Sequence, residues 1–168
     1  MTAPRSRPAR GGATNARAFA FVAVLSFAVV VAALVSQHAF AMEPCAWCVL
    51  QRLIFVAVGA FAVLGLVWRG PAGSRVAGTF ALVLAVAGIA AALWQHFVAA
   101  KSASCNLTLA DRVMSASQLD RLLPDVFEAR ASCADAAVNL LGIPYAMWSA
   151  LAFVLCVIVL IRILRRSG

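Results

Sequence analysis

Four long apolar runs constrain the fold of this chain more than any other feature of its sequence. An α-helix rises about 1.5 Å per residue, so about 20 apolar residues cross the hydrocarbon core of a bilayer. Of the 168 residues, 64% are hydrophobic and 12% are charged, whereas a soluble domain is about half apolar and about a quarter charged. The excess apolar surface must face lipid. The predicted spans are residues 18–37, 49–68, 76–98 and 143–164.

The basic residues predict how these spans are oriented. Nine arginines fall in three clusters that contain no acid, at residues 5–17, 69–75 and 162–166, and all six acids lie elsewhere. The positive-inside rule places such clusters in the cytoplasm. We therefore predict an all-α, single-domain transmembrane four-helix bundle with both termini cytoplasmic. Its other parts are a disordered basic tail at 1–15, a Gly- and Pro-containing turn at 69–75, and two periplasmic loops at 38–48 and 99–142.

The net charge of +8 could also indicate a nucleic-acid-binding protein. We exclude nucleic acid as a partner because no soluble domain remains to carry a basic surface. The lipid bilayer is the expected environment.

The second loop is polar but has apolar residues at helix-like intervals. Ser117 and Asp120 match a weak capping box. We predict one or two short amphipathic helices at the membrane surface, with an ordinary solvated loop as the alternative. The apolar residues at issue are Val113, Leu119, Leu122, Leu123, Val126 and Phe127.

The first span has a competing interpretation as a cleaved signal peptide. Ala39-Phe40-Ala41 resembles a small-x-small cleavage site behind a basic region and an apolar run. The run is longer than the roughly 7–15 residues of a signal core. We therefore predict that it stays as a span, and the mass of the mature protein would decide.

Five cysteines are sorted by this topology. Cys156 lies inside the fourth span, where we interpret it as a small packing residue. Cys45 and Cys48 form a C-x-x-C motif in the first outer loop, and Cys105 and Cys133 lie in the second. Cysteines in an oxidising compartment imply disulfides.

The C-x-x-C pair favours redox chemistry over a structural role. An inert staple is a reasonable interpretation of Cys105 and Cys133, because closing a long loop is stabilising. A ring that encloses two residues constrains almost no chain entropy, and such pairs are typically redox-active. C-x-x-C is also half of a zinc ligand set, but a second such motif is absent and the nearest extra ligands are His38 and His96. We predict no metal.

Arg52 follows Cys48 by one helical turn. A helix N-terminus stabilises a thiolate, and a cation on the same face adds to this effect. Burying an arginine in a span costs roughly 2.5 kcal/mol or more. Snorkelling to the interface is one explanation; the functional one is a charge that keeps Cys48 ionised and polarises an electron acceptor.

The acceptor must be reachable from the membrane. The chain has no glycine-rich dinucleotide motif and no haem or iron–sulfur ligand spacing. A lipid-soluble quinone fits, because a dithiol supplies its two electrons and two protons. Gln37-His38 and Gln95-His96 end the first and third spans on the same side, and of the two histidines we favour His96 for quinone contact.

Several short motifs, each weak alone, occur together in a specific order and spacing. They are Gln37-His38; Pro44-Cys45-Ala46-Trp47-Cys48 with Gln51-Arg52; Gln95-His96 before Cys105; Pro124-Asp125-Val126-Phe127 before Cys133; and Leu141-Gly142 followed by Trp148. On these motifs the chain resembles the bacterial disulfide bond formation protein B (DsbB) family over essentially all four spans.

The resemblance implies a multi-pass inner-membrane enzyme, a protein-dithiol:quinone oxidoreductase. It would reoxidise a periplasmic DsbA-like dithiol oxidase with a thioredoxin fold and pass the electrons to ubiquinone or menaquinone from the membrane pool. The redox-active disulfides would be Cys45–Cys48 and Cys105–Cys133. Cys105 would bond the partner, Cys133 would exchange with Cys45, and Cys48 would be the thiolate beside the quinone. The expected quinone-binding residues are Arg52, His96, Gln95 and Trp148.

Two positions depart from the family pattern. Val138 stands roughly where the family often has a tryptophan, and Pro144 is shifted from the usual proline position. Three alternatives remain: a tetraspan structural protein with stable disulfides, a metal-handling membrane protein, and a quinone-linked enzyme of the vitamin K epoxide reductase type, whose motif order differs.

Overall fold

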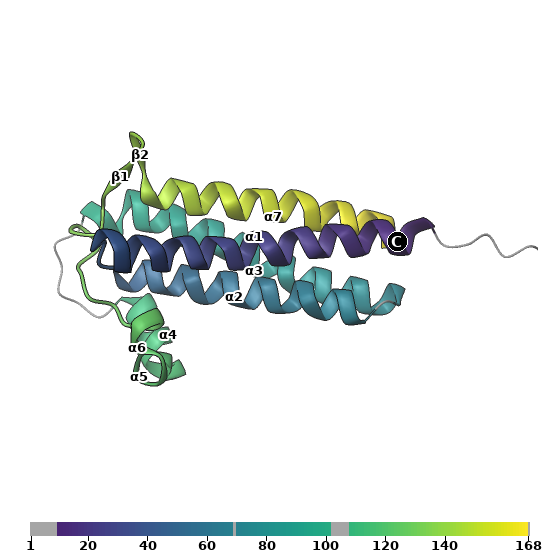
Figure 1. Cartoon of the computed structure of the whole chain (residues 1–168), viewed down its shortest axis with the longest axis horizontal. Helices are drawn as coiled ribbons and strands as arrows, with labels where there is room; N and C mark the ends of the chain where they lie inside the picture. Colours follow the sequence, from purple (N-terminus) through teal and green to yellow (C-terminus); the bar gives the residue numbers. More distant parts are fainter. Residues whose placement is uncertain (1–9, 69, 102–107, 168) are drawn as a thin grey trace, which may run out of the picture.

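Four long helices dominate the structure, a computed structural model that describes residues 10–68, 70–101 and 108–167 (Figure 1). Each of them contains a segment long and apolar enough to cross a membrane. This confirms the predicted fold class, a transmembrane bundle of four helices. The four are α1 (Arg10–Phe40), α2 (Ala46–Val67), α3 (Pro71–Phe97) and α7 (Tyr145–Ser167).

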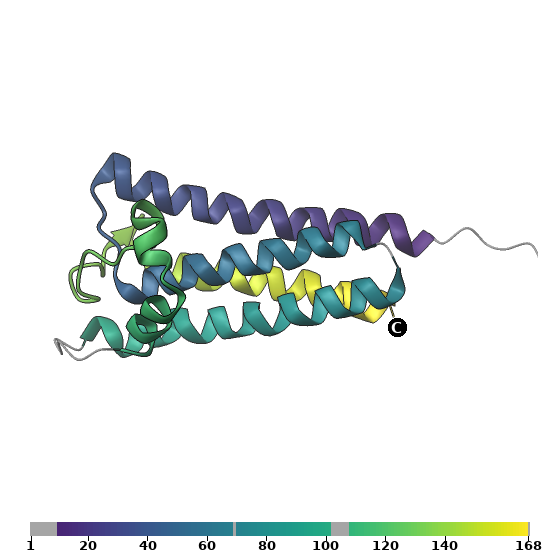
Figure 2. The ribbon, with the colours of Figure 1, turned by 90° about the horizontal axis from the view of Figure 1, so that it is seen from below.

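The four helices run side by side, so the bundle has two ends. α2 packs between α1 and α3, and α7 packs against α3 and α1. The start of α1, the α2–α3 connection and the end of α7 gather at one end (Figures 1 and 2). The other end carries the short helices and the hairpin, and it is where the C-x-x-C motif lies.

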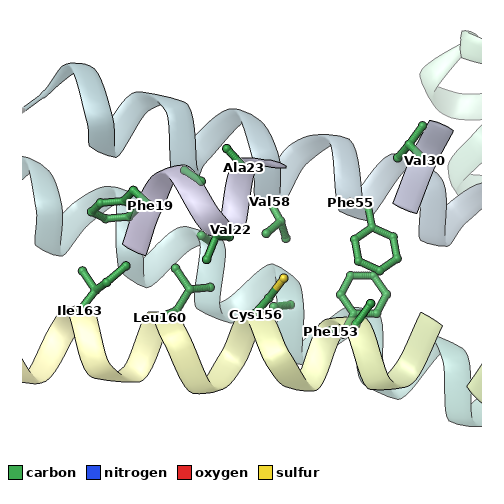
Figure 3. Packing of buried hydrophobic residues seen from close by; sticks show 14 residues of the cluster. Phe19, Val22, Ala23, Val30, Phe55, Val58, Phe153, Cys156, Leu160 and Ile163 are labelled. Atoms are coloured by element: carbon green, nitrogen blue, oxygen red, sulfur yellow. The ribbon is translucent and has the colours of Figure 1, made fainter. Parts of the chain in front are cut away.

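The core between the helices is built from aromatic rings set against small residues. The rings of Phe55 and Phe153 stack with centroids 3.7 Å apart (Figure 3). Phe153 also fills the place that a side chain on Gly88 would take. Lipid removes most of the hydrophobic drive for helices to associate, so close packing of this kind holds the bundle. Cys156 is fully buried in this core, 4.0 Å from the Ser26 hydroxyl.

The starts of all four long helices differ from the predicted boundaries. α2 begins at Ala46 rather than residue 49, so it includes Cys48. α1 begins at Arg10, within the segment predicted as a disordered tail. α3 begins at Pro71, inside the predicted turn, because a proline fits the first turn of a helix. α7 begins at Tyr145 rather than residue 143, because β1 (Asn139–Leu140) and β2 (Ile143–Pro144) pair as a small antiparallel hairpin before it.

The second loop forms more helix than was predicted. It contains the 3-10 turn η1 (Ala99–Lys101) and the helices α4 (Leu109–Ser117), α5 (Leu119–Leu122) and α6 (Pro124–Phe127). The predicted capping box at Ser117 is wrong. Ser117 is the last residue of α4, where its hydroxyl donates to the Met114 carbonyl, and the capping box is formed by Thr108 and Asp111.

These short helices pack against the cysteine-bearing end of α2. Met114 of α4 and Phe127 of α6 are both buried against Val49. The loop therefore covers the start of α2 instead of lying apart from the bundle, and it brings its own residues to the C-x-x-C motif.

Candidate functional site

The C-x-x-C motif forms the N-terminus of α2. Cys45 is the N-cap, and its sulfur accepts a hydrogen bond from the Cys48 backbone N–H at 3.4 Å. Cys45 Sγ and Cys48 Sγ face each other, unbonded, at 2.9 Å. The first helical turn thus presents two thiols to one another, and oxidation to a disulfide requires little movement.

A backbone clamp brings the second loop to this pair. The N–H groups of Arg130 and Ala131 both donate to the Pro44 carbonyl, at 2.9 and 3.2 Å. Cys133 follows closely and packs against Cys45. Cys105 lies outside the described residues.

The contact between Cys133 and Cys45 shifts the pKa values of the two thiols in opposite directions. The hydrogen bond that the Cys45 thiol donates lowers the pKa of Cys133, and the Trp47 backbone N–H adds to this effect. The same bond to Cys133, with the contact to Cys48 and burial, raises the pKa of Cys45. In the reduced protein Cys133 is therefore the more acidic thiol of this pair and Cys45 the less acidic one.

This difference predicts the order of alkylation in the reduced protein. Because only thiolates react quickly, iodoacetamide at pH 7 is expected to label Cys133 at least about tenfold faster than Cys45. Site-resolved mass spectrometry measures both rates. In a denaturant that unfolds the chain, the rates should become equal. Faster labelling of Cys45 in the folded protein would contradict the assignment.

Arg52 lies one turn beyond Cys48 and is 6% exposed. One of its terminal nitrogens donates to Gln37 Oε1 at 2.7 Å and to the Val126 carbonyl at 3.1 Å, and the other donates to the Ala33 carbonyl at 3.3 Å. All three acceptors are uncharged. The guanidinium is held inside the protein without a neutralising carboxylate among these partners, which argues against snorkelling and leaves its charge available to an anion.

Two buried glutamines form a hydrogen-bonded pair beside the sulfurs, and one of them, Gln95, contacts the sulfurs. The Gln51 amide donates to Gln95 Oε1. The Gln95 amide in turn donates to Cys48 Sγ at 3.0 Å and approaches Cys45 Sγ at 3.5 Å. Gln95 was predicted to lie at the quinone, whereas Gln51 and Gln37 were identified only as members of short motifs. A polar residue inside an apolar run was the signal that could have identified all three.

A cavity of about 340 Å³ extends from Cys48 and Arg52 between the helices. Gln51, Gln95 and Trp148 also line it, so four of the predicted site residues meet at one cavity. Most of its wall is aliphatic. The apolar lining includes Val29, Val30, Ala32, Ala33, Phe55, Leu140, Leu151, Ala152 and Leu155.

His96 is not among the residues that line this cavity. It borders a separate cavity of about 220 Å³ together with Lys101, Val138 and Pro144. The two positions that depart from the family pattern, Val138 and Pro144, therefore both line the cavity of His96, and neither lines the first cavity. Val138 also borders a further cavity that Cys48 reaches. Trp148 lies at the first cavity, where its ring N–H donates to the Leu140 carbonyl at 3.2 Å.

A third cavity, of about 510 Å³, lies on the loop side of the site. Cys48 and Arg52 border it as well, and its wall includes the charged residues Glu43, Arg130 and Asp135. Cys48 therefore stands between an apolar cavity and a polar one. Within the described ranges, no group of three or more His, Cys, Asp or Glu side chains is arranged to hold a metal ion.

Comparison with known proteins places this geometry in context. The family model described as disulfide bond formation protein DsbB matches residues 15–163. A protein called disulfide bond formation protein B from Ralstonia nicotianae is 32% identical over 156 residues, covering 88% of this chain and 92% of that one. A protein of the same name from Cupriavidus necator is 29% identical over 163 residues, covering 91% and 96%.

Proposed function

This chain belongs to the DsbB family of disulfide bond formation proteins, and on this premise we propose that it reoxidises a periplasmic DsbA-like dithiol oxidase and passes the electrons to a membrane quinone. It is a multi-pass protein of the bacterial inner membrane and an oxidoreductase of disulfide formation. The arginine clusters support cytoplasmic termini, which put the cysteine end of the bundle in the periplasm.

One observation supports this proposal above the others: Cys48 lies between a second thiol, Cys45, and the apolar cavity. Its sulfur lies 2.9 Å from that of Cys45, which contacts Cys133 of the loop. The same residue borders the apolar cavity beside Arg52. Two electrons that reach Cys45 from the loop can therefore be passed on by Cys48 into the cavity.

The family resemblance implies the thiol steps, and the contacts of Cys45 with Cys133 and Cys48 support the second of them. A dithiol partner attacks the Cys105–Cys133 disulfide at Cys105, and the Cys133 sulfur leaves as a thiolate. This thiolate attacks Cys45, a Cys133–Cys45 bond forms, the Cys45–Cys48 bond breaks, and its electron pair goes to Cys48. The second partner thiol then attacks the mixed disulfide and releases the oxidised partner, with Cys105 leaving as a thiolate. The Cys105 thiolate attacks Cys133, the Cys133–Cys45 bond breaks, and Cys45 leaves with the electron pair, so Cys45 and Cys48 are the reduced pair.

The cavity fits a quinone in shape and chemistry. Its aliphatic wall suits a hydrophobic ring and tail, Trp148 adds an aromatic face, and Arg52 stands where a polar carbonyl group would be oriented. When bound, a quinone accepts the two electrons and two protons of the Cys45–Cys48 pair. Arg52, held by Gln37, stabilises negative charge on Cys48 and on an acceptor beside it.

The proposal is tested by complete turnover in purified protein. The full chain in nanodiscs, with ubiquinone and a reduced DsbA-like partner under anaerobic conditions, should remove one quinone for each pair of partner thiols oxidised. A Cys156→Ala variant should turn over normally, because Cys156 lies in the helix core. Partner oxidation without quinone loss, or a Cys45–Cys48 bond that resists mild reductant, would refute the proposal. A stoichiometric bound metal ion would favour the metal-handling alternative.

A further inference from the structure

The two buried glutamines form a chain of hydrogen bonds that ends on the reactive sulfurs. We propose that Gln95 is the direct hydrogen-bond donor to the Cys48 thiolate, and that Gln51 is a positioning residue that fixes the direction of the Gln95 amide. The inference rests on the proposed function and assigns Gln95 to the sulfurs rather than to the quinone.

The direction of the Gln95 amide is decided by its neighbour. A glutamine side chain has a donor end and an acceptor end, and rotation by half a turn exchanges them. The Gln51 amide N–H occupies the acceptor end of Gln95. The donor end must then face Cys48, where the observed distance is 3.0 Å. The reversed orientation would place two donors against each other and an oxygen against the thiolate.

Burial makes this arrangement costly to change. Gln51 is 3% exposed and Gln95 is 5% exposed, so neither amide is open to bulk water. A buried polar group left without its partner carries the full cost of its desolvation. Gln51 therefore holds Gln95 in one orientation. Among the described residues, no hydrogen bond from Gln51 to either sulfur is recorded.

Gln95 and Arg52 support the thiolate in different ways. The three recorded hydrogen bonds of Arg52 go to the oxygens of Gln37, Val126 and Ala33, so it acts on Cys48 through its field. Gln95 places an N–H directly on the sulfur. When Cys133 attacks Cys45 and the electron pair moves to Cys48, Gln95 is the group in position to donate a hydrogen bond to the newly charged sulfur.

The test measures alkylation of Cys48 across a range of pH in the fully reduced full-length chain, resolved by mass spectrometry. Replacing Gln95 by methionine keeps the size of the side chain and removes the donor. Because the variant loses a charge-assisted hydrogen bond of ordinary strength, we expect its Cys48 to be alkylated about tenfold more slowly at pH 6. At a pH high enough to ionise Cys48 in both proteins, the alkylation rates of wild type and Gln95→Met should converge.

Two further variants separate a hydrogen-bonding role from a packing role. Gln95→Glu keeps the shape but presents an acceptor to the sulfur, and it should slow the reaction at least as much as Gln95→Met. Gln51→Met should produce part of the same shift, and adding it to Gln95→Met should change nothing further, because Gln51 acts through Gln95. Unfolding temperature in detergent and continued protection of Cys156 show that each variant is folded.

Three outcomes would overturn the inference. They are a Gln95→Met profile that coincides with wild type, a Gln95→Glu variant as reactive as wild type, and effects of the two glutamines that add in the double variant. The measurement needs neither a quinone nor a partner protein. A failure of the proposed function would therefore appear in the turnover experiment and not here.

Discussion

Replacing Cys48 by serine is expected to reduce quinone reduction at least about 10³-fold, which is the scale of loss when a reacting group is removed. A serine hydroxyl cannot form a disulfide or release an electron pair to an acceptor. Cys48 is also the only sulfur that borders the apolar cavity among the described residues.

The same variant should accumulate an inter-loop disulfide. Cys45 keeps its contact with Cys133, so its thiolate can attack the proposed Cys105–Cys133 disulfide at Cys133, which breaks that bond and releases Cys105 as a thiolate. Without Cys48, the bond between Cys45 and Cys133 is not displaced from the Cys45 side. Non-reducing gels of a protease-nicked chain should show the two loops joined through Cys45 and Cys133. Quinone reduction is followed by its near-ultraviolet absorbance under nitrogen, with Cys156→Ser as the matched cysteine control. Normal quinone reduction by Cys48→Ser would remove Cys48 from the proposed pathway.

Replacing Arg52 by methionine is expected to slow the quinone step about 10²- to 10³-fold, the range measured when one preorganised charge-stabilising donor is removed. Arg52 is a buried cation whose recorded partners are neutral oxygens. Methionine matches its length, accepts an apolar environment, and removes the positive field beside Cys48. Arg52→Lys keeps the charge but cannot reproduce the hydrogen bonds of both terminal guanidinium nitrogens, so it should retain only part of the wild-type rate of the quinone step.

A separate measurement shows whether Arg52 acts on the quinone step or on the fold. Arg52 also holds the loop through Val126, so its loss could loosen the contact between Cys133 and Cys45. Single-turnover experiments distinguish these effects, because exchange between the partner and the loop cysteines needs no quinone. Slow exchange with an unchanged quinone step would contradict the role assigned to Arg52.

The sequence predicted the parts of the fold that depend on local pattern. The lengths of the apolar runs identified all four spans. The C-x-x-C motif was predicted in the outer loop just before the second helix, whereas Cys45 is the N-cap of α2 and Cys48 lies in its first turn. The position of Arg52 one turn after Cys48 likewise follows from helix geometry. Helix starts were less predictable, because Pro71 can either end a helix or begin one, depending on its neighbours.

The contacts that complete the site join residues far apart in the sequence, so local sequence patterns could not predict them. Gln37 meets Arg52 only because of how α1 and α2 are rotated against each other. The approach of Cys133 to Cys45 depends on backbone bonds from the loop to the Pro44 carbonyl, and only the family resemblance anticipated it. His96 shows the opposite case: its position at the end of α3 suggested quinone contact, yet the turn of that helix directs it to a separate cavity.

The central claim is that the Cys45–Cys48 pair gives its electrons directly to a quinone. Reduced full-length protein is mixed anaerobically with equimolar ubiquinone, without any partner, while absorbance reports the quinone and mass spectrometry reports the cysteines. The account predicts the loss of up to one quinone per chain together with a new Cys45–Cys48 disulfide. An unchanged quinone spectrum, with Cys45 and Cys48 intact and reduced at the start, would contradict it.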